Sequence, residues 1–211
     1  MVVLRLLVIG FVCLVGGVVG AEDRTEEPAE SYSLSVDGKS VPLVLGEEVE
    51  LQVGAERAKV RLEVAPLRTF PYGGVRFSYP RYFTFEAKPL EDPKGDQWTL
   101  SGRNASILIL RAEAMDLETE ALMQEIRSQY PNVTTEAEAS SLKLGGTSYT
   151  GARLELRIEQ VRVEMSFYSI PMQRGSLVLA LQDALEDGAH SSEWTELLEL
   201  FDRSFSIERP K

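Results

Sequence analysis

Strict alternation of apolar and charged residues over positions 152–165 constrains the fold more than any other feature of this chain. The apolar side chains change parity once, at Glu159-Gln160, and a two-residue loop that pairs Ile158 with Val161 keeps all of them on one face. A period of two does not suit a helix, so these residues predict two long antiparallel strands. We expect the opposite face to be solvated, or covered by a helix at its edge. That face carries Arg153, Glu155, Arg157, Arg162 and Glu164.

Four shorter alternating runs predict a small all-β unit over residues 32–69. The pair Asp37-Gly38 lies between the first two runs and favours a tight hairpin turn, in which both central residues need positive φ. Pro42 has no backbone N–H to donate, so we expect the second strand at a sheet edge.

Residues 70–211 predict a larger domain that combines strands with two helices. Residues 177–181 are continuously apolar, which is typical of a central strand covered on both faces. Apolar residues recur at helical spacing in 116–130 and again after a cap at Ser191 or Ser192. The second of these stripes consists of Trp194, Leu197, Leu198 and Phe201. We therefore expect an α+β fold, with one antiparallel sheet flanked by helices.

The first 21 residues resemble a secretory signal peptide, since the apolar run 6–21 follows Arg5 and ends in small residues. An uncleaved anchor is the alternative, but the run is shorter than the roughly 20 residues that span a bilayer. We expect cleavage before Ala21 or Glu22 and an extracytoplasmic protein, periplasmic or secreted, that keeps no stable membrane span. The polar residues 22–31 are expected to form a flexible linker.

Composition excludes several classes of function. Cys13 is the single cysteine and lies in the expected signal, so neither a disulfide nor a cysteine-based zinc site is expected. The formal net charge of −11 makes nucleic-acid binding unfavourable. The single histidine, His190, is expected to be an exposed residue before a helix rather than a catalytic base. We find no catalytic residue, metal ligand set or cofactor motif.

Aromatic residues crowd the start of the larger domain and could line a groove for a ligand or peptide. Packing on a strand face is the competing interpretation. The candidate binding residues are Tyr72, Tyr82 and Trp98.

Three stretches of the larger domain resemble the PsbP-like fold, which photosystem II extrinsic proteins share with a nuclear Ran-binding family and bacterial envelope proteins. They are residues 74–80 (GVRFSYP), residues 145–151 (GGTSYTG) and the final Arg203-Ser204-Phe205. The resemblance covers 70–207, with Phe83 where many members have tryptophan. It implies an α/β/α sandwich with a non-enzymatic binding or assembly role, and it transfers no functional residue.

The sequence thus favours an exported, non-enzymatic binding or assembly protein of the cell envelope, whose partner is an envelope protein or a small ligand. The alternative is a carboxylate-dependent hydrolase, which would need two acids within about 10 Å in a cleft. Sequence spacing leaves that alternative, the partner's identity and the oligomeric state open.

Overall fold

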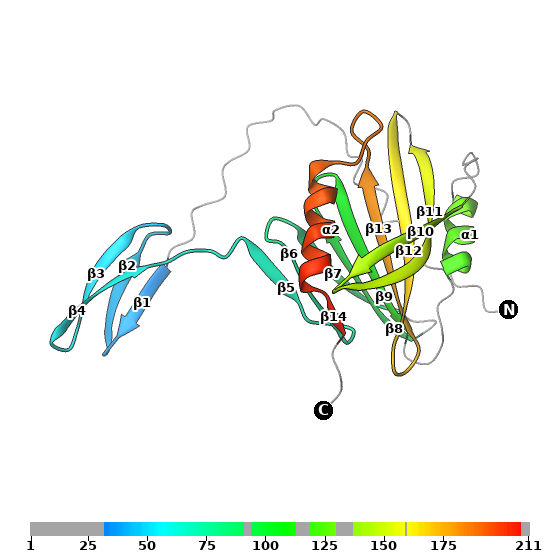
Figure 1. Ribbon diagram of the computed structural model, residues 1–211. Helices are drawn as coiled ribbons and strands as arrows, with labels where there is room; N and C mark the ends of the chain where they lie inside the picture. The colour runs from blue at the N-terminus through cyan, green and yellow to red at the C-terminus, as the bar shows by residue number, and fades with distance from the viewer. Residues whose placement is uncertain (1–31, 91–93, 113–118, 130–136, 159, 208–211) are drawn as a thin grey trace. The chain divides into compact units, whose positions relative to one another are not determined.

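The computed structural model describes residues 32–90, 94–112, 119–129, 137–158 and 160–207 (Figure 1). The predicted signal peptide and linker, residues 1–31, lie outside this part of the chain. The chain divides into two compact units between Pro66 and Leu67. Within the described residues, no helix has the length and apolar character needed to cross a membrane.

The smaller unit consists of two hairpins. Its strands are β1 (Tyr32–Val36), β2 (Lys39–Leu43), β3 (Glu48–Val53) and β4 (Glu56–Arg61). The predicted turn between β1 and β2 is confirmed, since Asp37 and Gly38 have φ of 49° and 78°. A parallel bridge between Leu45 and Leu62 connects the segments that follow β2 and β4. In the described residues, each hairpin forms a separate two-stranded sheet.

The larger unit is built on a seven-stranded antiparallel sheet in the order β10-β11-β12-β13-β9-β8-β7. Its strands are β7 (Thr84–Leu90), β8 (Gly95–Ser101), β9 (Ala105–Ala112), β10 (Glu138–Leu144), β11 (Thr147–Ile158), β12 (Val161–Pro171) and β13 (Ser176–Ala184).

The two clearest strand predictions are confirmed. Ile158 pairs with Val161 at the end of the β11–β12 hairpin, and Glu155 lies directly opposite Glu164. The residues of β13 from Ser176 to Asp183 are all buried, and the strand lies between β12 and β9 in the middle of the sheet. An apolar run without alternation is what a strand covered on both faces requires.

Different layers cover the two faces of this sheet, as Figure 1 shows for the two helices. On one face, α2 (Ser192–Ser204) and a three-stranded sheet pack over a core that includes Phe77, Leu179 and Phe201. The three-stranded sheet has the order β14-β6-β5, with β5 (Leu67–Phe70), β6 (Val75–Pro80) and β14 (Ser206–Ile207). On the other face, α1 (Thr119–Gln129) packs over a second core, to which it contributes Leu122 and Ile126.

The expected α+β fold, a helix-flanked α/β/α sandwich, is wrong. The described residues form 14 strands and two helices of 11 and 13 residues, so the protein is mostly β. The expectation of one antiparallel sheet also fails, because β6 pairs with β5 and β14 in a separate sheet over the α2 face. Alternation defines which side chains share a face of a strand, but it does not define which strand pairs with it.

Candidate functional site: an aromatic cluster and a polar pocket

The structure brings two of the three predicted binding residues together. The ring of Tyr72 stacks on that of Trp98, with centroids 5.9 Å apart and planes inclined by 13°. Trp98 is 7% exposed and belongs to the core, whereas Tyr72 is 47% exposed. The pair therefore extends the core to the surface.

Gly73 allows this stacking. Its φ of +66° suits glycine, and a Cβ at this position would lie 3.1 Å from the Trp98 ring. The turn at Gly73-Gly74 thus lets the backbone pass close to the indole while Tyr72 covers its outer face.

Two phenylalanines that the sequence analysis did not select complete the cluster. Phe70 is fully buried and meets Trp98 edge to face at 5.6 Å. Phe85 is 38% exposed, and its ring lies 5.9 Å from that of Tyr72. Phe85 pairs with Leu100 and is therefore a diagonal neighbour of Trp98, a relation that only the β7–β8 register reveals. We call Phe70, Tyr72, Phe85 and Trp98 the aromatic cluster.

The aromatic cluster lies beside an open edge of the main sheet. Phe85 is part of β7, which is the last strand of the seven and, among the described residues, pairs with β8 alone. The edge also carries Lys88 and Pro89, residue types that discourage uncontrolled strand addition. The cluster thus combines half-exposed aromatic rings with a strand whose outer side has no partner in the described part of the chain.

Tyr82, the third predicted residue, has no ring contact with Tyr72 or Trp98 among the described residues, although it is 55% exposed. Its ring contacts Phe83, and its hydroxyl interacts with Glu193. Partial burial of the phenol and the hydrogen bond to Glu193 raise the pKa of Tyr82 to about 12. Tyr82 thus contacts Phe83 and Glu193 and is not a member of the aromatic cluster.

Glu193 binds the loop between β8 and β9. Its carboxylate accepts hydrogen bonds from the backbone N–H groups of Arg103, Asn104 and Ala105, at 3.1, 2.7 and 2.6 Å. Burial raises the pKa of Glu193, but these bonds, together with that from Tyr82, outweigh burial and hold it below the ordinary value. The contact fixes the first turn of α2 to the main sheet.

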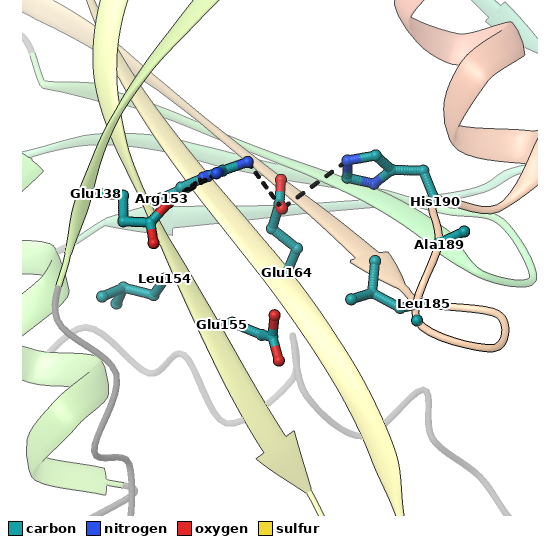
Figure 2. A pocket seen from close by; sticks show the side chains of 9 residues that line it. Glu138, Arg153, Leu154, Glu155, Glu164, Leu185, Ala189 and His190 are labelled. Carbon is teal, nitrogen blue, oxygen red and sulfur yellow. Dashed lines mark hydrogen bonds and ion pairs between the residues drawn. The ribbon is translucent and has the colours of Figure 1, made fainter.

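A polar pocket of about 290 Å³ opens beside the N-terminal end of α2 (Figure 2). Charged side chains from three adjacent strands and the histidine before α2 line it. They are Glu138, Arg153, Glu155, Glu164 and His190, with Leu154 and Leu185 among the remaining lining residues.

A buried carboxylate orients the histidine of this pocket. Asp183 is fully buried and accepts hydrogen bonds from the Ser191 backbone N–H at 3.1 Å and the Ser191 hydroxyl at 2.6 Å. His190 Nδ1 lies 2.9 Å from Asp183 Oδ2, and the imidazole stacks on Trp194. Of the two predicted caps of α2, Ser191 is the one used, and its hydroxyl accepts a bond from the Trp194 N–H. His190 is therefore more firmly held than a free loop residue.

The pocket does not assemble a Ser-His-Asp triad. Ser191 donates to Asp183 rather than to the imidazole, so the arrangement provides no activated serine. Among the described residues, no group of three or more histidine, cysteine, aspartate or glutamate side chains could hold a metal ion.

No protein-family model and no curated protein matches the chain, so the resemblance to PsbP-like proteins has no support from a family model. Solved structures similar to the chain include a protein of Bacteroides thetaiotaomicron VPI-5482, with 11% identity and a TM-score of 0.39. That match covers 69% of this chain, which spans 50% of the Bacteroides protein. Another is LpqN, involved in cell envelope biogenesis of Mycobacterium tuberculosis, with 16% identity and a TM-score of 0.33, covering 77% of this chain and 91% of LpqN. TM-scores below 0.5 do not establish a common fold.

Proposed function

We propose that this chain is an exported, non-enzymatic binding or assembly protein of the cell envelope, and that it takes a partner protein at the aromatic cluster. The proposal of export rests on the apolar run 6–21, which is typical of a secretory signal. The proposal of binding rests on the half-exposed rings of Tyr72 and Phe85.

Packing explains the buried members of the cluster but not the exposed ones. Phe70 and Trp98 are core residues, and their aromatic contacts stabilise the fold. Tyr72 and Phe85 keep 47% and 38% of their surface in contact with water. Rigid aromatic side chains supported by a core are the residues that protein interfaces use as anchors, since they bury a large area with little loss of side-chain entropy.

Affinity capture with matched variants tests this proposal. Purified protein is immobilised and exposed to envelope extract, and the retained proteins are compared between the unchanged chain, Tyr72→Ala and Phe85→Ala. Tyr82→Ala is the control, because it removes an exposed aromatic ring outside the cluster. We expect a specific partner that is retained by the unchanged chain and by Tyr82→Ala but lost from the two cluster variants.

Thermal unfolding of each variant separates binding from folding. The proposal requires that Tyr72→Ala or Phe85→Ala loses the partner while its melting temperature stays near that of Tyr82→Ala. If each variant that loses the partner is also unfolded, the cluster serves only the core, and the partner surface lies elsewhere.

The polar pocket gives the hydrolase alternative limited support. Glu155 and Glu164 lie opposite each other in one pocket, as a pair of catalytic acids would. The hydrogen bond from Arg162 lowers the pKa of Glu155, which suits the ionised member of such a pair and not its general acid. The exposed rings of the aromatic cluster are the stronger support, so binding is the function that we propose.

A further inference from the structure

In the polar pocket, a neutral His190 and the Glu164 carboxylate place two hydrogen-bond acceptors opposite each other. Asp183 already accepts two bonds from Ser191, and an ionised carboxylate can only accept. His190 Nδ1, 2.9 Å from Asp183, must therefore carry a proton and donate it. In the neutral imidazole the other nitrogen, Nε2, then has a lone pair, and this nitrogen faces the Glu164 carboxylate across the pocket (Figure 2).

Glu164 is poorly satisfied for a carboxylate in this environment. Its side chain is 14% exposed, and among the described residues its closest polar contact is the Ser166 hydroxyl at 3.4 Å. Arg153 Nη1 lies 3.5 Å from Glu164 Oε2, while the same guanidinium bonds Glu138 at 2.7 and 3.1 Å. Arg153 is thus committed mainly to Glu138, and a mostly buried carboxylate with only long contacts is costly to maintain.

The spacing of the two acceptors matches one small donor. His190 Nε2 and Glu164 Oε2 are 3.9 Å apart, so a single nitrogen between them could lie about 2.8 Å from each, a normal hydrogen-bond length. A primary ammonium group has three N–H donors and a positive charge. Glu138 and Glu155 bond Arg153 and Arg162. Glu164 has no arginine or lysine nitrogen closer than 3.5 Å among the described residues, so its negative charge favours a cationic ligand.

We propose that this pocket binds a primary ammonium group on a short aliphatic stem, with N–H bonds to His190 Nε2 and Glu164 Oε2. The volume of about 290 Å³ is at the lower limit for ligand pockets and suits a small amine or one lysine side chain. Leu185 and Leu154 supply apolar surface for the stem. This pocket shares no lining residue with the aromatic cluster. A result that disproves ammonium binding would therefore not contradict the proposed function.

Nitrogen-15 NMR of the imidazole tests the proposal directly, because His190 is the single histidine of the chain and its signals need no assignment. The purified protein is titrated with n-butylammonium at about pH 8, where an ordinary histidine is neutral. We expect a saturable shift of the Nε2 signal. Tetramethylammonium has the same charge but no N–H, so it should produce no saturable shift at equal concentration.

Two variants that each remove one negative charge test whether Glu164 is the acceptor of the ammonium group. Glu164→Gln should weaken n-butylammonium binding by about tenfold or more, the effect expected when a hydrogen bond to a charged group is lost. Glu86→Gln, on the exposed β7, should leave binding unchanged. Titration with Nα-acetyl-lysine amide beside n-butylammonium distinguishes a protein lysine from a free amine as the source of the ammonium.

Three results would overturn the proposal. The first is an equal response to tetramethylammonium, which would reduce the effect to nonspecific charge attraction. The second is unchanged affinity in Glu164→Gln. The third is an imidazole that is already doubly protonated at about pH 8, because Nε2 would then itself be the donor to Glu164. The comparison of the two cations uses the unchanged protein and so remains decisive if a variant fails to fold.

Discussion

The carboxylate of Glu193 accepts a hydrogen bond from the backbone N–H of Ala105 at 2.6 Å, which joins the first turn of α2 to the start of β9. The neighbouring N–H groups of Arg103 and Asn104 bond the same carboxylate. A single side chain therefore satisfies three consecutive backbone donors, two in the β8–β9 loop and one at the start of β9. This contact fixes the start of α2 against a segment that lies 88 to 90 positions earlier in the chain.

Glu193→Ala is expected to lower the free energy of unfolding by about 2–3 kcal/mol, because it leaves part-buried backbone N–H groups without an acceptor. Urea unfolding followed by circular dichroism measures the effect. Glu199→Ala, which removes an exposed glutamate of the same helix, is the control and should be nearly neutral. Equal midpoints for the two variants would contradict a structural role for the carboxylate.

The pH dependence of stability should report the same contact. The pKa of Glu193 in the folded protein lies below its ordinary value of 4.5, so the carboxylate stabilises the fold above that value and loses its contribution as the pH falls through the folded pKa. Glu193→Gln should therefore show a shallower loss of stability on acidification than the unchanged protein. Parallel curves of unfolding free energy against pH would show that other carboxyl groups dominate.

We expect Phe201→Ala and Trp194→Ala each to lower the free energy of unfolding by roughly 3–5 kcal/mol, because both remove a large aromatic side chain from the core. Phe201 is fully buried and meets Phe77 edge to face at 4.7 Å, while Trp194 is 5% exposed. Chemical unfolding measures both changes. Denaturant midpoints that hardly move would mean that α2 contributes little to the core.

Gly73→Ala should destabilise the larger unit more than Gly146→Ala does. Both glycines have positive φ, +66° and +81°, so both variants carry the backbone cost of a left-handed residue. Only Gly73 faces a side chain, because its added Cβ would lie 3.1 Å from the Trp98 ring, whereas nothing lies within 4 Å at Gly146. The difference between the two thermal unfolding temperatures reports the contacts of the added Cβ with Trp98 and, at 3.4 Å, with Leu177. A difference of zero would mean that these side chains shift freely.

The strands were predictable from the sequence because an alternating pattern acts locally. The pairing of Ile158 with Val161 follows from the parity change alone, and the buried β13 follows from its continuous apolar run. The partner of β6 was not predictable, because strand pairing depends on residues far away in the chain. The mostly β architecture was missed for the same reason.

The site residues, too, were only partly predictable from the sequence. Tyr72 and Trp98 were found from their residue type, but the inclusion of Phe85 and the separation of Tyr82 depend on the register and on Glu193. In sequence, Glu193 is an ordinary acidic residue in the first turn of a helix, where the helix dipole favours it. Its backbone donors come from another element, and no local pattern indicates them.

The strand order of the main sheet has a consequence for how the protein folds. The strands β7 to β9 form one meander and β10 to β13 another, and each can pair with its neighbours as it is made. The two meanders join through the pairing of β13 with β9, from Leu177 opposite Arg111 to Asp183 opposite Ala105, which requires closing a long loop of chain. Contacts of this kind slow folding and leave apolar strands open in the meantime. A chain that emerges N-terminal end first thus holds an incomplete sheet, in which β9 still lacks its β13 partner, until residues 176–184 arrive.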